Sequence, residues 1–118
     1  MTLSFVCDLD SALAALEGDR ELLARMIGIF LAETPPLLRE TRESIEREDE
    51  VRLERAAHTL RGAICNFAAP NAFAAASRVQ EIARRKNWSV AALAYSELEK
   101  EMQELLEVLV GFTKGDAL

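Results

Sequence analysis

Residues that interrupt helices or build metal and disulfide sites are scarce in this sequence. Its 118 residues include three prolines, five glycines, two cysteines and a single histidine. One histidine cannot supply the two Glu-x-x-His motifs of a di-iron bundle, and the spacing of zinc ligands is likewise missing. Cys7 and Cys65 form no Cys-x-x-Cys spacing, and we expect both to be reduced thiols. The sequence therefore predicts a protein without a metal ion or a disulfide bond.

Other missing features narrow the function and the location. The formal net charge of −6 argues against a nucleic-acid partner, because a phosphate backbone needs a basic face. No apolar run is long enough to span a bilayer, and the N-terminus lacks the layout of a signal peptide. A glycine-rich phosphate-binding loop is also missing, so we do not expect ATP binding. These features predict a soluble, cytoplasmic protein that does not contact a membrane.

The abundant residues favour helices. Half of the residues are hydrophobic, and alanine, leucine, glutamate and arginine dominate, which favours an all-α fold in a single domain over residues 1–118. Apolar residues recur at spacings of three and four through four long segments joined by short connections. Such segments pack most simply as an antiparallel up-and-down four-helix bundle, with an additional short N-terminal helix as a lid.

Capping residues and helix breakers predict where the helices begin and end. We expect residues 1–7 to be extended, and a short helix to run from Asp8 or Asp10 to Leu16. Pro35 and Pro36 interrupt the next helix, and the sequence leaves open whether it kinks there or restarts with a proline in its first turn. The long helices are predicted from Asp19 to about Arg47, over 50–67 after a cap at Asp49, from the Pro70 region to about Asn87, and from a cap at Ser89 onward.

The single histidine, His58, is predicted to face water from the central helix. A helix advances about 100° per residue, and His58 lies about 140° from the centre of the apolar stripe. An exposed neutral imidazole is a good nitrogen nucleophile. The predicted buried stripe consists of Leu53, Ala56, Ala57, Leu60, Ile64 and Phe67.

Gly62 and two arginines surround His58 on the helical wheel. A glycine inside a helix costs about 1 kcal/mol relative to alanine, and Gly62, one turn beyond His58, would leave the space beside the ring clear. Arg61 and Arg55, three residues to either side, could steady an anionic group on the imidazole. More widely, the middle third of the chain is rich in arginine, which predicts a basic patch near His58 for an acidic docking surface.

This motif resembles that of the histidine-containing phosphotransfer (HPt) domain, whose signature reads roughly His-x-Leu-Lys-Gly-Ser-Ala-x-x-x-Gly-Ala. The sequence departs from the signature at Arg61, Ala63 and Ala68, and one helix later it has Val79-Gln80 where the family usually has Leu-Glu. The matching residues are His58, Leu60, Gly62, Asn66, Phe67 and Ala69.

The resemblance implies a phosphorelay intermediate of bacterial type. His58 would accept a phosphoryl group, through its Nε2 atom, from the aspartate of a response-regulator receiver domain and pass it to another receiver domain. The expected partners are such receiver domains and a hybrid sensor histidine kinase. The chain would be a monomer without a cofactor, because the receiver would hold the Mg²⁺ ion. The docking surface around His58 would comprise Arg55, Arg61, Gly62, Cys65, Asn66 and Ala69.

Two other interpretations stay open. The chain could be a docking module of the same fold that binds a receiver or kinase without carrying phosphate. It could also be the dimerisation and phosphoacceptor part of a histidine kinase, although Thr59 and Ala63 stand where that family usually has an acidic residue and a proline. Whether the chain is free-standing or the C-terminal part of a hybrid kinase is likewise open.

Overall fold

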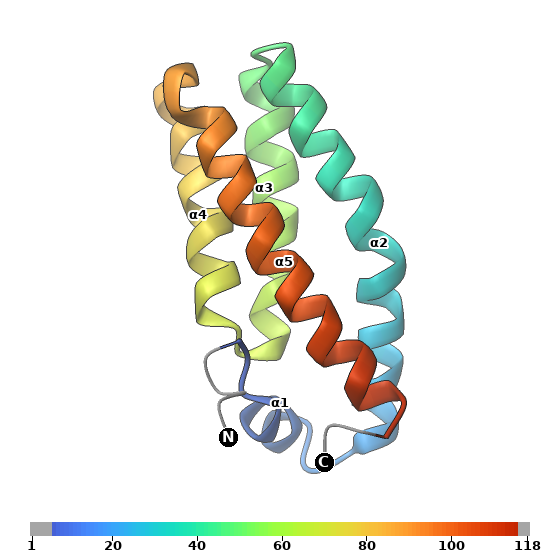
Figure 1. Ribbon diagram of the computed structural model, residues 1–118. Coiled ribbons are helices and arrows are strands. Elements are labelled where there is room, and N and C mark those ends of the chain that lie inside the picture. The colour runs from blue at the N-terminus through green and yellow to red at the C-terminus, as the bar shows by residue number, and fades with distance from the viewer. Residues whose placement is uncertain (1–5, 116–118) are drawn as a thin grey trace.

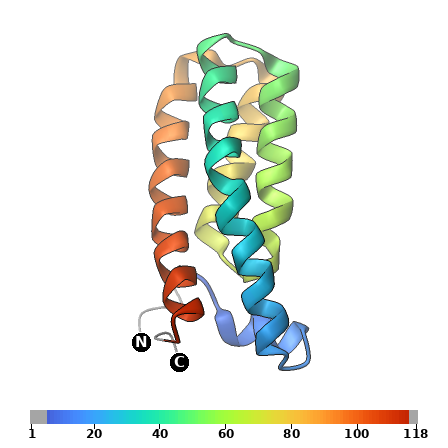
Figure 2. The ribbon, with the colours of Figure 1, turned by 90° about the vertical axis from the view of Figure 1, so that its right-hand side faces the viewer.

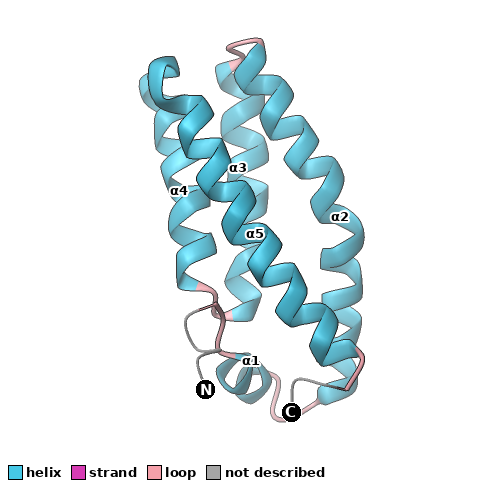
Figure 3. Cartoon of the chain, viewed as in Figure 1, coloured by secondary structure: helices cyan, strands magenta, loops and turns pink. Residues whose placement is uncertain are grey.

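The computed structural model describes residues 6–115, in which helices are joined by short loops and no strand occurs (Figure 3). The all-α fold predicted from the sequence is therefore confirmed. Of the segment 1–7, expected to be extended, residues 1–5 lie outside the described part. The helices are α1 (Leu9–Ala15), α2 (Arg20–Glu46), α3 (Glu50–Ile64), α4 (Pro70–Arg85) and α5 (Ala91–Thr113), with short 3₁₀ turns at Cys65–Phe67 and Trp88–Val90.

The four long helices form one bundle, and successive helices run in opposite directions along it (Figures 1 and 2). Each helix packs against two others, in the order α2, α3, α4, α5 and back to α2. The short helix α1 lies across the end of the bundle where α3 leads into α4. There the backbone amide of Asp8 donates to the carbonyl of Ala68 over 2.9 Å, which ties the N-terminal segment to the α3–α4 connection.

Three aspartates begin the first three helices. The side chains of Asp8, Asp19 and Asp49 accept hydrogen bonds from backbone amides three residues further on, at 3.0, 3.0 and 3.1 Å. These bonds satisfy amides that have no partner within the helix. The caps predicted at Asp19 and Asp49 are confirmed, and Asp8 rather than Asp10 caps α1.

The core forms where the apolar stripes meet. All six residues of the stripe predicted on α3 and its 3₁₀ extension are at most 4% exposed. The rings of Phe30 and Phe67 pack at 5.0 Å between their centres near the α1 end. From α5 the core receives Ala91, Ala94, Leu98, Met102, Leu105, Leu109 and Phe112.

Helix α2 continues through both prolines, so it does not restart at Pro35 or Pro36. Both prolines are exposed, so their rings lie on the outer side of the helix and do not disturb the packing of the core. Buried Thr34 and Thr41 each donate their hydroxyl to the carbonyl four residues earlier, at 2.7 Å. Polar side chains can therefore lie on the buried face of α2 without an unsatisfied donor.

Two predicted boundaries need correction. The central helix is α-helical only to Ile64 and continues as a 3₁₀ turn to Phe67, after which Ala68 takes a left-handed conformation with φ of 51°. Ser89 does not cap α5, because it lies inside the 3₁₀ turn before that helix and donates its hydroxyl to Oδ1 of Asn87 at 3.0 Å. Val90 precedes α5 without a side-chain cap.

None of the helices within residues 6–115 is both long enough and apolar enough to cross a membrane.

Candidate functional site

The outward face of α3 carries the predicted site. His58, Arg55, Gly62 and Cys65 are exposed on this face, and Asn66 is exposed in the 3₁₀ turn that follows it. The apolar stripe on the opposite side of α3 packs against α2 and α4. The direction of this stripe therefore determines which side chains of α3 face water. The outward orientation of His58 that the helical wheel predicts is confirmed.

Ala69 does not belong to this exposed face. It is 3% exposed and lies in the hydrophobic core. Its main chain follows the left-handed residue Ala68, which turns the chain inward before α4 begins. The expectation that Ala69 takes part in docking is therefore wrong as regards its side chain, which offers almost no surface.

A buried side chain of α4 lies against His58. Gln80 is 2% exposed, and its Nε2 atom lies 3.5 Å from Nδ1 of His58. Its Oε1 atom accepts a hydrogen bond of 2.8 Å from Nη1 of Arg61. Within the described residues, Nε2 of His58 has no hydrogen-bond partner. One nitrogen of the imidazole thus lies against Gln80, and the other has no hydrogen-bond partner in the described part of the chain.

Gln80 was not identified as a site residue from the sequence. Its position offered one signal, since it is a polar residue on the buried face of α4, between Val79 and Ile82. A buried amide needs hydrogen-bond partners. The partners themselves lie on a different helix, 19 and 22 residues away in the chain, and no periodicity within α4 reveals them.

The side chain of Arg61 is directed toward α4. Besides its bond to Gln80, its guanidinium lies 5.0 Å from the centre of the Phe73 ring, in a cation–π contact. Such contacts favour arginine because its planar, weakly hydrated head stacks on aromatic faces. Arg61 therefore has a fixed place beside the histidine, which a freely mobile surface cation would not have.

A shallow hollow of about 380 Å³ adjoins His58 between α3 and α4, and we name it the His58 hollow. Inside it Glu54 accepts a hydrogen bond of 2.7 Å from Arg84. This bond and the charge of Arg84 lower the pKa of Glu54, with smaller contributions from Gln80 and His58. Among the described residues Arg55 makes no ion pair. The hollow is lined by Val51, Glu54, Arg55, His58, Gln80 and Arg84.

The predicted basic patch is largely neutralised by acidic partners. Arg52 forms a two-pronged pair with Glu40 at 2.8 and 2.7 Å, and Arg78 pairs with Glu97. Arg84, Arg85 and Lys86 pair with Glu54, Glu81 and Glu50 respectively. The expectation of a broad basic surface is therefore wrong, because the helices bring acidic side chains beside most of these cations. Arg55 and Arg61 are left as the two cations near His58 without a carboxylate partner in the described part of the chain.

Gly62 has no structural need to be glycine. A Cβ atom at this position would have no contacting atom within 4 Å beyond its own stretch of helix, and the backbone does not take a left-handed conformation there. Neither close packing nor backbone strain explains the residue. An open space beside His58 is the one feature that Gly62 creates.

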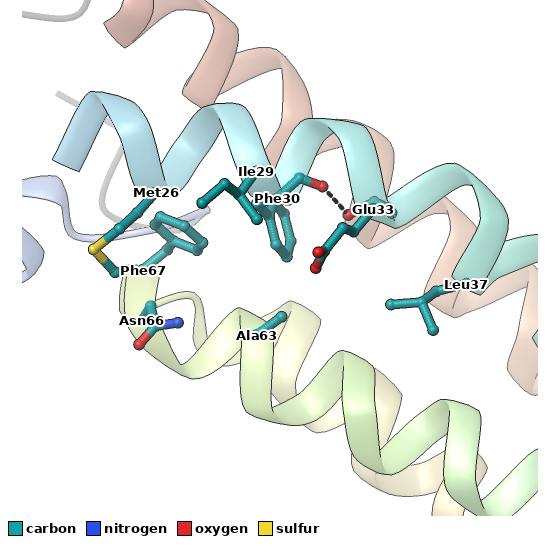
Figure 4. A pocket seen from close by; sticks show the side chains of 9 residues that line it. Met26, Ile29, Phe30, Glu33, Leu37, Ala63, Asn66 and Phe67 are labelled. Atoms are coloured by element: carbon teal, nitrogen blue, oxygen red, sulfur yellow. Dashed lines mark hydrogen bonds between the residues drawn. The ribbon is translucent and has the colours of Figure 1, made fainter. Parts of the chain in front are cut away.

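An apolar groove of about 220 Å³ lies between α2 and α3, on the other side of α3 from the His58 hollow (Figure 4). We name it the α2–α3 groove. Ile29 on its wall is 58% exposed, which is high for a large apolar side chain. One of its lining residues, Ala63, directly follows Gly62 in the sequence. The groove is lined by Met26, Ile29, Phe30, Glu33, Thr34, Leu37, Ala63, Asn66 and Phe67.

The described residues contain no cluster of three or more histidine, cysteine, aspartate or glutamate side chains that could hold a metal ion. Fold and site together define a helical bundle that presents one imidazole nitrogen to the solvent. The family model of the Hpt domain matches residues 25–108, and the chain belongs to this family. Hpt domains are phosphotransfer modules of two-component signalling that interact with receiver domains. Comparisons with curated proteins and with solved structures gave no match.

Proposed function

We propose that His58 is the phosphoacceptor of a phosphorelay, taking a phosphoryl group from the aspartate of one receiver domain and passing it to the aspartate of another. The proposal rests on the surroundings of the two ring nitrogens of His58. Nδ1 of His58 lies against Gln80, while Nε2 has no partner in the described part of the chain and the side chain is exposed beside an open glycine. An incoming acyl phosphate can therefore reach Nε2.

The step itself is an in-line displacement. The lone pair of Nε2 forms a bond to phosphorus, the bond between phosphorus and the aspartate oxygen breaks, and that electron pair leaves on the carboxylate. The ring then releases one proton to solvent, which leaves an uncharged imidazole ring bearing the anionic phosphoryl group. A second receiver's carboxylate reverses the sequence. Since little covalent chemistry falls to the protein, positioning and charge stabilisation are its main contributions.

Arg55 is the cation of this chain best placed to meet the phosphoryl group. It lines the His58 hollow and has no ion-pair partner among the described residues, whereas Arg61 is engaged by Gln80 and Phe73. The Mg²⁺ ion that neutralises the transferred group would belong to the receiver, since residues 6–115 contain no cluster of ligands for it. We expect Arg55 to affect the transfer rate more than binding.

The α2–α3 groove suits the docking of a receiver domain. Ile29 and the wall of the groove supply apolar area next to Gly62, and affinity between proteins usually depends on a few such central apolar contacts. The chain would act as a monomer in the cytoplasm, as one domain over residues 1–118, with receiver domains and a hybrid sensor histidine kinase as partners. Size-exclusion chromatography tests the monomer and thereby distinguishes the chain from a dimeric kinase fragment.

The test is transfer of label from a radiolabelled, phosphorylated receiver domain to the purified chain. We expect wild type to take up label that is acid-labile and base-stable, and a His58→Gln variant to take up none while binding the receiver equally well. An Ile29→Glu variant should bind more weakly and keep the same labelling chemistry at saturating receiver. Equal binding to wild type and His58→Gln with no label on either would overturn the proposal in favour of a docking module.

A further inference from the structure

One carboxylate projects into the apolar α2–α3 groove. Glu33 is exposed, and its carboxylate lies between Phe30 and Leu37 and is directed toward α3 (Figure 4). The other residues that line the groove are uncharged, and most of them are apolar. Glu33 therefore carries the one formal charge among the residues that line the α2–α3 groove.

The facing helix supplies no cation to this carboxylate. Farther along α2, Glu40 pairs with Arg52 of α3 at 2.7 Å between the nitrogen and oxygen atoms. Opposite Glu33, two turns nearer the start of α2, the end of α3 and its 3₁₀ extension contribute Ala63 and Asn66 to the groove. Within the described part of the chain Glu33 forms no ion pair. Its charge is left to solvent or to a partner.

A partner that covers the groove takes water away from this carboxylate. The apolar wall that attracts a partner includes Ile29, which is 58% exposed, and Glu33 lies within the same groove. A carboxylate that loses its water without gaining a charged donor costs free energy. The hydroxyl of Thr34 already donates to the carbonyl of Phe30 at 2.7 Å, and the amide of Asn66 is uncharged. The compensating cation has to come from the partner.

We propose that Glu33 is a specificity-determining residue, which favours receiver domains that present an apolar side chain together with a lysine or arginine to the α2–α3 groove. The inference rests on the receiver docking that is part of the proposed function. Specificity is a difference between affinities. Glu33 contributes to both sides of that difference, because it attracts a receiver with the matching cation and penalises a receiver without it.

A second unpaired charge lies on the opposite side of α3. Arg55, which makes no ion pair among the described residues, lines the His58 hollow between α3 and α4. A negative charge on the α2 side and a positive charge on the α4 side thus flank the helix that carries His58. Complementary charges determine the orientation of a docked partner as well as its choice. The cation of a matching receiver therefore lies on the part of its docking face that meets α2.

The first test is a cycle of substitutions on both partners. The probe is the receiver domain that binds the wild-type chain most tightly in isothermal titration calorimetry, together with variants in which each lysine or arginine of its docking face is replaced by methionine. Glu33→Gln should weaken binding of the unmodified receiver about tenfold. One receiver variant, the one that lacks the matching cation, should bind Glu33→Gln about tenfold more tightly than it binds wild type.

The matched control is Glu107→Gln. It removes the same charge from an exposed position on α5 that does not line the groove, and it should change binding by less than about twofold. If the unmodified receiver binds Glu33→Gln as tightly as wild type, or if no receiver variant prefers Glu33→Gln, the inference is refuted.

The second test separates a covered charge pair from a charge at the rim. Loss of a pair that is buried on docking changes the dissociation rate, whereas loss of a rim charge changes the association rate and its dependence on salt. Surface plasmon resonance should show about tenfold faster dissociation of the receiver from Glu33→Gln. The thermal midpoint of the free variant should equal that of wild type, because Glu33 has no ion-pair partner within the described residues. An effect confined to the association rate would overturn the inference.

Label transfer from the same phosphorylated receiver to the wild-type chain distinguishes this inference from the proposed function. If His58 takes up label and no receiver cation couples to Glu33, the inference fails alone. If a receiver cation couples to Glu33 and His58 takes up no label, the inference holds for a docking module and the phosphoacceptor proposal fails. Both are refuted if no receiver domain binds the chain.

Discussion

Replacing Gly62 should make the domain more stable and less active. The position lies inside α3 with no atom near a new Cβ, so Gly62→Ala gains helix propensity without steric strain. The gain is about 1 kcal/mol, which for a chain of this length raises the Tm by about 4 °C. Gly62→Gln should gain roughly half as much and extend a long side chain into the space beside His58.

Two measurements separate these effects. Thermal unfolding followed by circular dichroism gives the stability, and label transfer from a phosphorylated receiver gives the activity. We expect Gly62→Gln to lose at least about tenfold in transfer rate, because a displacement of about 1 Å in a docked geometry is already costly, and Gly62→Ala to lose less.

Gly28 supplies the matched control. It lies in the interior of α2, its Cβ would likewise meet no atom within 4 Å, and it lines neither the His58 hollow nor the α2–α3 groove. Gly28→Ala should therefore stabilise the fold as much as Gly62→Ala and leave transfer unchanged. Destabilisation by Gly62→Ala, or wild-type transfer by Gly62→Gln, would refute the reasoning about this glycine.

Three further predictions concern the core, the acid dependence and the thiols. Phe67→Ala removes a fully buried ring and should lower the free energy of unfolding in urea by about 3–5 kcal/mol; a loss below about 1 kcal/mol would contradict the packing. The hydrogen bond from Arg52 lowers the pKa of Glu40 below its ordinary 4.5, so the stabilisation from this pair is complete above pH 4.5 and is lost as the pH falls through the lowered value. Urea midpoints should accordingly fall less on acidification in Glu40→Gln than in wild type. Burial, aided by Asp8, raises the pKa of Cys7 to about 11, so a thiol reagent at neutral pH should label exposed Cys65 quickly and Cys7 only on unfolding; two fast thiols per chain would contradict this.

Local patterns in the sequence were sufficient for the helices and for the exposed face of α3. The spacing of Leu53, Leu60 and Ile64 defines a stripe within one helix, and the position of His58 relative to that stripe needs no knowledge of its neighbours. Asp19 and Asp49 cap their helices through amides three residues away. Each of these features depends on contacts within about one or two turns of the same helix.

Local patterns failed where a partner lies on another element. Ser89 was assigned as a cap because it precedes an apolar seam, yet a 3₁₀ turn intervenes and its hydroxyl bonds to Asn87. The many arginines in the middle third of the chain predict a basic patch. In the structure, however, the packing of neighbouring helices places Arg52 beside Glu40 and Arg84 beside Glu54. The distribution of charge along the sequence does not show which residues form ion pairs between helices. Those pairs depend on how the helices are rotated and shifted along their axes relative to one another.

The sequence by itself determined that a lone histidine faces water from an amphipathic helix, with a glycine one turn away, because helical periodicity is a property of a single segment. Only the tertiary structure decided what surrounds that ring. The register between α3 and α4 places the buried amide of Gln80 between His58 and Arg61. That register results from the interlocking of two apolar stripes across the core, and so does the choice of which imidazole nitrogen stays open.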